Sequence, residues 1–444
     1  MSKLSNDFKK TLSGIDARLI KRYDRIICEH MNVSGAAHAG LKALPDKISS
    51  FASTQAAWRF YQNEAVTLQK LQEPLTAAAH KGIETRCDQY GLCLHDWSRI
   101  SYKHKNKQDT YEVTHATDIG YDLQSSLLVS DRDGEPLAPL AQRLVSADGS
   151  YATYYDDSEA HLPAKPHLDE VTDCIESLKQ QRFKKPLVHV IDREADSVGH
   201  IRQWESNGMH WLVRVKDNPR VEYLGKPTAC QSVAEALTYK PTREVIHQGQ
   251  SATQWIASTA VRLTRPATPS QKKERKRSIP GAPIEARLVV SRVFSDRGEL
   301  LAQWLLLTNV DQDEVGASTI ALWYYWRWKI ESFFKLLKSA GHHLESWQQA
   351  SAPAIAKRLL VASMACVTVW AIAADESQEG KGLRSFLMKL SGRQTKRKKP
   401  DTHPALLAGL WVLLSMMEVM AAYSPEELDS FKSTAQKYLR GEDV

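Results

Sequence analysis

The order of predicted elements between residues 88 and 217 constrains the fold more than any other feature of the sequence. From about residue 88 the apolar residues recur with a period of two and are rich in β-branched side chains, which predicts strands. The segment "YGLCLHDWSRISY" predicts one strand, and "YDLQSSLLVS" with "LAPLAQRLV" predicts a hairpin. A helix ("HLDEVTDCIESLKQQR"), a short buried strand ("PLVHVID"), a second helix ("ADSVGHIRQWESNG") and another strand ("MHWLVRVKD") follow. This mixture predicts an α/β fold.

Three acidic residues fall at places where such elements end or pack. Asp96 and Asp192 lie at the ends of predicted strands, and Glu331 lies in the helical segment "WYYWRWKIESFFKLLK". Strand-end carboxylates can converge on one point, and a helix packed on the sheet edge can supply a third. The element order and the placement of these acids together predict an RNase H-like core of the retroviral integrase type.

The helical segment at residues 323–338 carries a narrow polar strip. At about 100° per residue, its polar side chains fall within an arc of roughly 80°, beside an apolar arc of about 120°. The polar residues are Tyr324, Arg327, Glu331, Lys335 and Lys338, and the apolar ones are Trp323, Trp326, Ile330, Phe333, Phe334 and Leu337. Such a strip suits a cleft wall where a carboxylate holds a metal and cations meet phosphate. A surface helix with i,i+4 ion pairs around Glu331 is the open alternative.

The three acids suggest the kind of metal. Asp96, Asp192 and Glu331 offer hard oxygen donors, which suit Mg²⁺ or Mn²⁺. Two such ions about 3.5–4 Å apart would activate a hydroxyl and stabilise the leaving oxygen of a phosphoryl displacement. Glu194 and Asp196 follow Asp192 closely, and acids at helix N-termini are more commonly capping groups.

The remaining chain divides by pattern. Residues 1 to about 70 read as basic helices with aromatic residues, which suits a DNA-binding unit. Residues from about 218 to 303 alternate short strands with Pro-rich polar turns, and the last 70 residues are helical again. The predicted domains are a helical N-terminal DNA-binding domain (1–70), the first part of the core (71–217), a β-rich insertion (218–303), the second part of the core with the Glu331 helix (304–372) and a helical C-terminal region (373–444).

Composition limits the class of protein. The 444 residues carry a net charge of +7, and the basic runs at 272–277 and 396–399 favour a polyanionic partner. The six cysteines contain no C-x-x-C pair, which argues against a zinc site or a disulfide frame and favours the reducing cytoplasm. The apolar runs at 359–374 and 405–422 are expected to be buried helices, so no membrane partner is predicted.

At the acidic segments the chain resembles the bacterial DDE transposases of the IS-four family, the group that contains the Tn-five transposase. Tyr324, Arg327, Glu331 and Lys338 match the family's Y-(2)-R-(3)-E-(6)-K signature at every position. The segment "VIDREADS" is similar to its second acidic motif and "LCLHDWSRISY" to its first. The resemblance covers the chain from about residue 16 to the end. His95 and Trp97 flank the first acid where relatives have an acid and a hydroxyl residue.

The resemblance implies roles for individual residues. Asp96, Asp192 and Glu331 would form the catalytic, metal-binding triad, with two Mg²⁺ ions and Mn²⁺ as a substitute. The implied DNA-binding residues are Tyr324, Arg327, Lys335, Lys338, Trp304, Arg214, Arg18 and Arg22. Among them Trp304 matches the tryptophan that helps house a flipped base, and Arg214 a basic residue beside that pocket.

The resemblance also implies an activity and partners. The expected function is cut-and-paste transposition, with cleavage at transposon ends through a DNA hairpin and strand transfer into target DNA. The partners would be terminal inverted repeats, target DNA and a second copy of the chain bound through residues 373–444. The location would be the cytoplasm of a bacterium, at the nucleoid. The alternatives are an RNase H-like nuclease without strand transfer and an inactive DNA-binding derivative.

Overall fold

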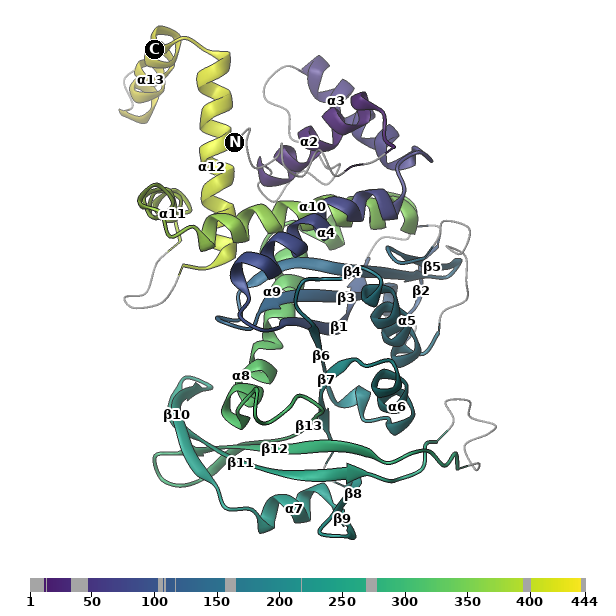
Figure 1. The fold of residues 1–444 in the computed structure, drawn as a ribbon. Coiled ribbons are helices and arrows are strands. Elements are labelled where there is room, and N and C mark those ends of the chain that lie inside the picture. Colours follow the sequence, from purple (N-terminus) through teal and green to yellow (C-terminus); the bar gives the residue numbers. More distant parts are fainter. Residues whose placement is uncertain are drawn as a thin grey trace. The chain divides into compact units, whose positions relative to one another are not determined.

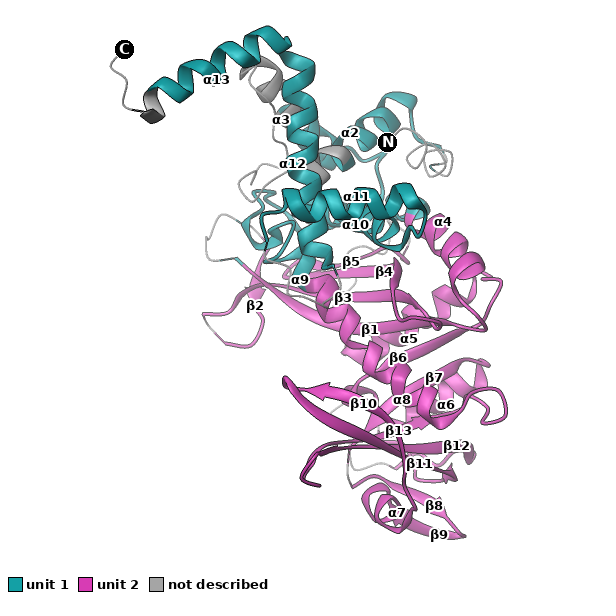
Figure 2. Cartoon of the chain, turned by 90° about the vertical axis from the view of Figure 1, so that its left-hand side faces the viewer, with its two compact units in different colours: residues 1–74, 102–108, 335–444 teal, residues 75–101, 109–334 magenta. Residues whose placement is uncertain are grey.

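The computed structural model describes residues 12, 14–32, 47–102, 107, 109–115, 117–155, 165–216, 218–268, 278–393 and 401–440. The chain forms two compact units, which Figure 2 shows in teal and magenta. The first unit comprises residues 1–74, 102–108 and 335–444, and the second comprises residues 75–101 and 109–334. Asp96, Asp192 and Glu331 all belong to the second unit.

The second unit is built on a mixed sheet. Its central strands are β1 (Gly91–Ser101), β3 (Ile119–Ser130), β4 (Pro136–Ser146), β6 (Leu187–Ile191) and β7 (His210–Val215). They lie in the order β4-β3-β1-β6-β7, in which β3 is antiparallel to β1 and β4, whereas β6 is parallel to β1 and β7. These strands confirm the α/β class and the element order predicted for residues 88–217. Two short strands, β2 (Tyr111–Glu112) and β5 (Gly149–Ala152), pair at β3 and β4.

Residues 218–303 extend the same sheet. β13 (Leu300–Thr308) pairs with β7 on one side and with β12 (Ile284–Ser295) on the other, so the added strands continue the core. Next come β11 (Gln250–Leu263), β8 (Arg220–Tyr223) and β9 (Lys226–Ala229), while β10 (Lys240–His247) pairs with β11. The described part of this sheet has thirteen strands. α7 (Cys230–Ala236) lies against this extension (Figure 1).

Helices cover both faces of the central strands. α5 (His167–Lys179) and α6 (Val198–Ser206) lie on one side, and α8 (Ala317–Trp326) lies on the other (Figure 1). α5 is amphipathic, because Val171, Cys174, Ile175 and Leu178 recur at helical spacing and are buried. Its apolar face packs with Trp204 of α6 and Trp211 of β7 in one hydrophobic cluster. Burial of each such large side chain contributes about 1.5–3 kcal/mol.

The helical segment expected at residues 323–338 forms two helices joined end to end. α8 ends at Trp326, Arg327 forms the junction, and α9 (Trp328–Leu337) continues in the same direction. The amide of Arg327 donates to Tyr324 O at 3.1 Å, a tighter i→i−3 bond than an α-helix makes. The predicted apolar arc is confirmed, because Trp323, Ile330, Phe333, Phe334 and Leu337 are all buried and Trp326 is half-buried.

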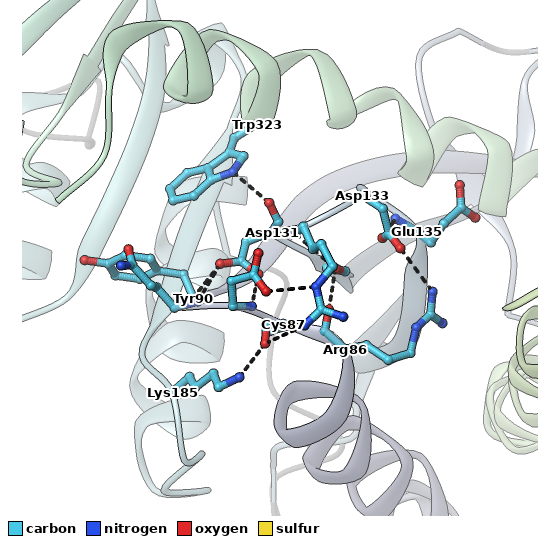
Figure 3. Close-up of polar contacts among 12 residues, drawn as sticks. Arg86, Cys87, Tyr90, Asp131, Asp133, Glu135, Lys185 and Trp323 are labelled. Carbon is cyan, nitrogen blue, oxygen red and sulfur yellow. Dashed lines mark hydrogen bonds and ion pairs between the residues drawn. The ribbon is translucent and has the colours of Figure 1, made fainter. Parts of the chain in front are cut away.

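The turn between β3 and β4 fixes α8 and α9 against the sheet (Figure 3). The indole N–H of Trp323 donates to the carbonyl of Asp131 at 3.3 Å. The Asp131 carboxylate in turn accepts three backbone N–H groups just before β1, including that of Tyr90 at 2.9 Å. Lys329 Nζ pairs with Glu135 Oε1 at 2.7 Å. The helix pair is therefore attached to the same turn that fixes the start of β1.

Gly134 in this turn provides a test of that attachment. Its φ is +69°, and a Cβ added there would lie 2.4 Å from Cδ2 of Trp326. We expect Gly134→Ala to destabilise the protein by about 1–3 kcal/mol through overpacking against Trp326. Gly208 has the same φ of +69° but open space around it, so Gly208→Ala is the matched control for backbone strain. Equal losses for the two variants in chemical denaturation would contradict the contact.

The first unit is helical in its described residues. It contains α2 (Ala17–Asn32), α3 (Lys47–Gln62), α10 (Ala352–Ala374), α11 (Gln378–Leu390), α12 (His403–Ala422) and α13 (Pro425–Arg440). α4 (Leu68–Arg86) passes from this unit into the second. Short 3₁₀ turns occur at Arg193–Ala195 and Leu344–Ser346.

Two of the described helices, α10 and α12, are long and apolar enough to cross a membrane by length and composition. The apolar stretch of α10 is 78% buried, which confirms the expected core helix. That of α12 is only 39% buried, so the expected burial of this second run is wrong. One face of α12 packs on α2, α10 and α11, while Met416, Met417 and Met420 remain exposed.

Candidate active site

Asp96 and Asp192 are brought together by two parallel strands. β1 and β6 are paired up to Leu94 and Val190, and each acid lies two residues beyond this last pair. Neighbouring strands lie about 4.8 Å apart, so the register makes the two acids neighbours at one edge of the pair. β6 ends at Ile191, and Asp192 Oδ1 accepts the backbone N–H of Glu194 at 2.8 Å. This bond holds the carboxylate at the end of the strand.

Arg327 connects the helical segment to the first acid. Its Nη1 donates to Asp96 Oδ2 at 2.6 Å, and the other oxygen, Oδ1, accepts the N–H of Trp97 at 2.9 Å. Arg327, the residue between α8 and α9, is thus also the residue whose side chain contacts β1. Glu331 follows one turn later, and its side chain is exposed.

The surface-helix alternative is wrong. It required i,i+4 ion pairs from Arg327 to Glu331 and from Glu331 to Lys335. Arg327 instead pairs with Asp96, and within the described part of the chain Glu331 makes no ion pair or hydrogen bond. At Arg327 the polar strip therefore contacts the first strand acid.

The charges of these acids act on neighbouring residues of the site. Burial is the main cause that raises the pKa of Asp96 to about 6, and the nearby Glu331 carboxylate raises it further. The Arg327 guanidinium and the Trp97 N–H act in the opposite direction and lower this pKa. Burial also raises the pKa of Tyr324. The positive charges of Arg327 and Arg214 lower this pKa, whereas the negative charge of Asp192 raises it. Each of the three acids thus acts on a neighbour at the site.

The aromatic and basic residues near the acids form one surface. The ring centroids of Trp304 and Tyr324 lie 5.7 Å apart in an edge-on arrangement. The charge of Arg214 acts on the Tyr324 hydroxyl, and the pairing of Arg214 with Leu306 places it diagonal to Trp304 on the same face of the sheet. The structure therefore gathers seven of the predicted site residues: Asp96, Asp192, Glu331, Tyr324, Arg327, Trp304 and Arg214.

The other four predicted DNA contacts belong to the first unit. Lys335 is exposed on the last turn of α9, and Lys338 just after this helix pairs with Glu345 at 3.0 Å. Arg18 is exposed and Arg22 is half-buried, both on α2. These placements leave their DNA contacts as predictions.

The sequence did not identify His167 as part of this region. Its ring stacks on Trp97 with centroids 4.5 Å apart, and its nitrogens bond Asp122 at 2.9 Å and Glu194 at 3.0 Å. The hydrogen bond to Asp122 is the main cause that raises the pKa of His167 to about 9. His167 therefore connects the segment after Asp192 to β3. No local sequence pattern predicts such a contact, because it joins residues that are distant in the sequence.

Glu194 and Asp196 make structural contacts, although not as the capping groups that the sequence favoured. Asp192 supplies the capping oxygen, while Glu194 bonds His167. Asp196 pairs with Arg265 and accepts the N–H of Lys216 at 3.2 Å. These bonds connect the end of β6 to β7 and to the strand extension.

The donor set fits a hard divalent cation. Asp96, Asp192 and Glu331 present carboxylate oxygens, and in the described residues neither Glu331 nor the second oxygen of Asp192 has a hydrogen-bond partner. The only described group of three Asp, Glu, His or Cys ligand atoms within 4.8 Å of one another lies elsewhere, at Cys93, His95 and His189. One ligand atom from each of the three acids therefore does not fall within 4.8 Å of the other two in this structure.

The chain is similar to known proteins over the segment that holds these acids. The family model described as "Transposase DDE domain" matches residues 89–365, which include Asp96, Asp192 and Glu331. No curated protein matches the sequence. The chain is similar to a cryo-EM structure of a piggyBac transposase synaptic complex with hairpin DNA, with a TM-score of 0.35 and 9% identity. That alignment covers 76% of this chain and 55% of the other, so this chain spans about half the length of that protein. Because the family model covers more than half of the sequence, the chain belongs to the transposase DDE domain family.

Proposed function

We propose that this protein is the transposase of an insertion sequence related to the IS-four family, which cleaves transposon ends and joins them to target DNA. One observation carries the proposal: Asp96 and Asp192 follow two paired parallel strands, and Arg327, one turn before Glu331, binds Asp96, all inside the segment matched by the transposase DDE domain. The mixed sheet and the family support an RNase H-like core. Bacterial cytoplasm at the nucleoid is the proposed location.

Asp96, Asp192 and Glu331 are the residues that would hold two Mg²⁺ ions, with Mn²⁺ as a substitute. When bound, such ions activate the attacking hydroxyl and stabilise the leaving oxygen of an in-line phosphoryl displacement. Arg327 already holds a positive charge against Asp96 at 2.6 Å, so it competes with a cation for this carboxylate. A guanidinium released from Asp96 would bind a DNA phosphate in the same place.

The remaining residues of the site would position DNA. Arg214 and the hydroxyl of Tyr324 offer hydrogen-bond donors to phosphate oxygens beside the acids. Trp304 is half-buried and edge-on to Tyr324, so it presents an apolar ring next to the phosphate contacts. This arrangement supports a stacking role for Trp304 on an extruded base, which a hairpin turn needs because its end cannot stay fully stacked.

The proposed reaction order uses one triad throughout. Water attacks the phosphodiester at a transposon end, which breaks one P–O bond and leaves a 3′-hydroxyl. This hydroxyl attacks the opposite strand to form a hairpin, water reopens the hairpin, and the 3′ ends attack target DNA. Each step forms one P–O bond and breaks another, so no further cofactor is required.

The first unit would supply recognition and assembly. Arg18 and Arg22 on α2, with Lys335 and Lys338, are the proposed contacts to end DNA. A second copy of the chain is proposed to bind at the C-terminal helices. Exposed apolar side chains support this surface, since Met416, Met420 and Phe431 are 45%, 69% and 56% exposed.

A strand-transfer assay tests the function against its two alternatives. The substrate is a precut duplex carrying the terminal inverted repeat, mixed with plasmid target and Mg²⁺. Joined product supports a transposase, cleavage without joining supports an RNase H-like nuclease, and binding without either supports an inactive derivative. An uncut end in the same assay reports the hairpin by its mobility on a denaturing gel.

The raised pKa of Asp96 predicts a pH-dependent Mg²⁺ requirement. A protonated carboxyl binds no cation, so Mg²⁺ affinity is full above a pH of about 6, the pKa of Asp96, and weakens as the pH falls through it. Below that value each pH unit should raise the half-saturating Mg²⁺ concentration about tenfold. Mg²⁺ titrations of end cleavage between about pH 5 and about pH 8 measure this. A requirement that does not change with pH would contradict the role of Asp96.

A further inference from the structure

A buried cluster of sulfur and nitrogen donors lies on the face of β1 opposite Asp96. Side chains alternate along a strand, so Cys93 and His95 share one face and Asp96 points to the other. His189 on β6 lies directly beside Cys93 in the parallel register. One ligand atom from each of these three residues lies within 4.8 Å of the other two. All three side chains are buried, at 0–2% exposure.

The hydrogen bonds of the two histidines suit metal ligation. His95 Nδ1 lies 2.9 Å from Ser126 Oγ, and its Nε2 lies 2.9 Å from His189 Nδ1. With Nδ1 donating to Ser126, the lone pair of His95 is on Nε2 and accepts the Nδ1–H of His189. Both nitrogens become ligands when the His189 proton moves to its own Nε2. Ser126 is itself held in place by Gln124 at 3.0 Å and Cys174 at 3.3 Å. A ligating histidine usually has such an outer partner on its other nitrogen.

We propose that Cys93, His95 and His189 bind one Zn²⁺ ion that joins β1 to β6 behind the active site. Zn–N and Zn–S distances of about 2.0–2.3 Å place tetrahedral ligand atoms roughly 3.3–3.8 Å apart. All three ligand atoms lie within 4.8 Å of one another, and the two ring nitrogens, 2.9 Å apart, would have to separate slightly to share an ion. Imidazole and thiolate are the donors that select zinc over Mg²⁺.

The position gives the ion a structural role. Cys93 and His95 lie on the strand that carries Asp96, and His189 lies three residues before Asp192 on the strand that ends there. An ion shared by both strands would fix their spacing from the face covered by α5. This inference is independent of transposition, because it concerns only the protein and its bound metal.

Metal content is the direct test. Full-length tag-free protein, loaded with zinc and dialysed extensively, is expected to retain about one zinc ion per chain by plasma mass spectrometry. Cys93→Ser and His189→Gln should each lose it. Cys230→Ser is the matched control, because Cys230 is equally buried in the same unit but lies in an apolar cluster. Asp192→Ala should also keep its zinc, which separates this site from the carboxylate triad.

Two further readouts keep the test decisive if a variant folds poorly. Cobalt loaded into the wild-type chain should show thiolate-to-metal charge-transfer absorption, and a zinc chelator should lower the wild-type melting temperature. Wild-type protein that retains far less than one zinc ion, shows no such absorption and melts identically with chelator would overturn the proposal. The cluster would then be a buried hydrogen-bonded histidine pair only.

Discussion

Replacing Asp192 with alanine is expected to lower Mg²⁺-dependent end cleavage by roughly a thousandfold or more, because one of the three carboxylates proposed to bind the metal is lost. End binding should stay within about threefold, because most affinity for DNA comes from phosphate contacts elsewhere. Asp96→Ala and Glu331→Ala should behave alike, since the three acids are proposed to act as one unit. Single-turnover cleavage with purified protein measures the first effect, and a filter or gel-shift assay measures the second.

The control for this loss is Asp313→Asn, which removes an exposed acid in the loop after β13. It should cleave at the wild-type rate. Cleavage by Asp192→Ala at a rate near that of the control would show that this acid does not serve catalysis. A parallel loss of binding and cleavage would instead indicate a fold defect, which circular dichroism of the variant detects.

Glu170→Gln is expected to destabilise the second unit by about 3–5 kcal/mol, because it leaves the buried Arg143 guanidinium without its charge partner. Nη1 of Arg143 lies 2.6 Å from Glu170 Oε1, and the two side chains are 0% and 2% exposed. Nη2 donates to Ser150 Oγ at 2.6 Å, so the pair connects α5 to β4 and β5. Chemical denaturation followed by tryptophan fluorescence measures the loss.

A double variant separates the cost of an unpaired charge from the loss of attraction. Replacing both partners with apolar residues, Arg143→Met with Glu170→Leu, removes the stranded charge and should recover most of the stability. The exposed pair of Arg262 and Glu222, 3.1 Å apart, is the control, and Glu222→Gln should cost less than about 1 kcal/mol. Equal losses at the buried and exposed pairs would refute the argument.

Much of the core followed from local patterns. The period-two runs predicted β1, β3 and β4, and the buried run before Asp192 predicted β6, because these patterns depend on which faces of an element are buried. The apolar arc of residues 323–338 was equally readable, since it needs only helical geometry. Their places at strand ends and on the helical segment singled out Asp96, Asp192 and Glu331, and the family resemblance then implied one shared role for them, which no periodicity does.

The contacts that assemble the site could not be predicted from the sequence, because they join segments that are far apart in the chain. Nothing local to Arg327 indicates that it breaks the helix and binds Asp96. The fit of Gly134 against Trp326 and the bridge made by His167 likewise depend on tertiary packing. The cysteine spacing argued against a zinc site, yet Cys93 and His189 come together through strand pairing rather than through a short motif. The burial of α12 was overestimated, because composition does not tell which faces find a neighbour.

The most direct measurement is an anomalous difference map from crystals of the full chain with terminal-repeat DNA and Mn²⁺. The account predicts manganese peaks within coordination distance of carboxylate oxygens from Asp96, Asp192 and Glu331, with Arg327 turned from Asp96 toward a phosphate. Manganese bound at other residues, or any of the three carboxylates lying outside the shared centre, would contradict it.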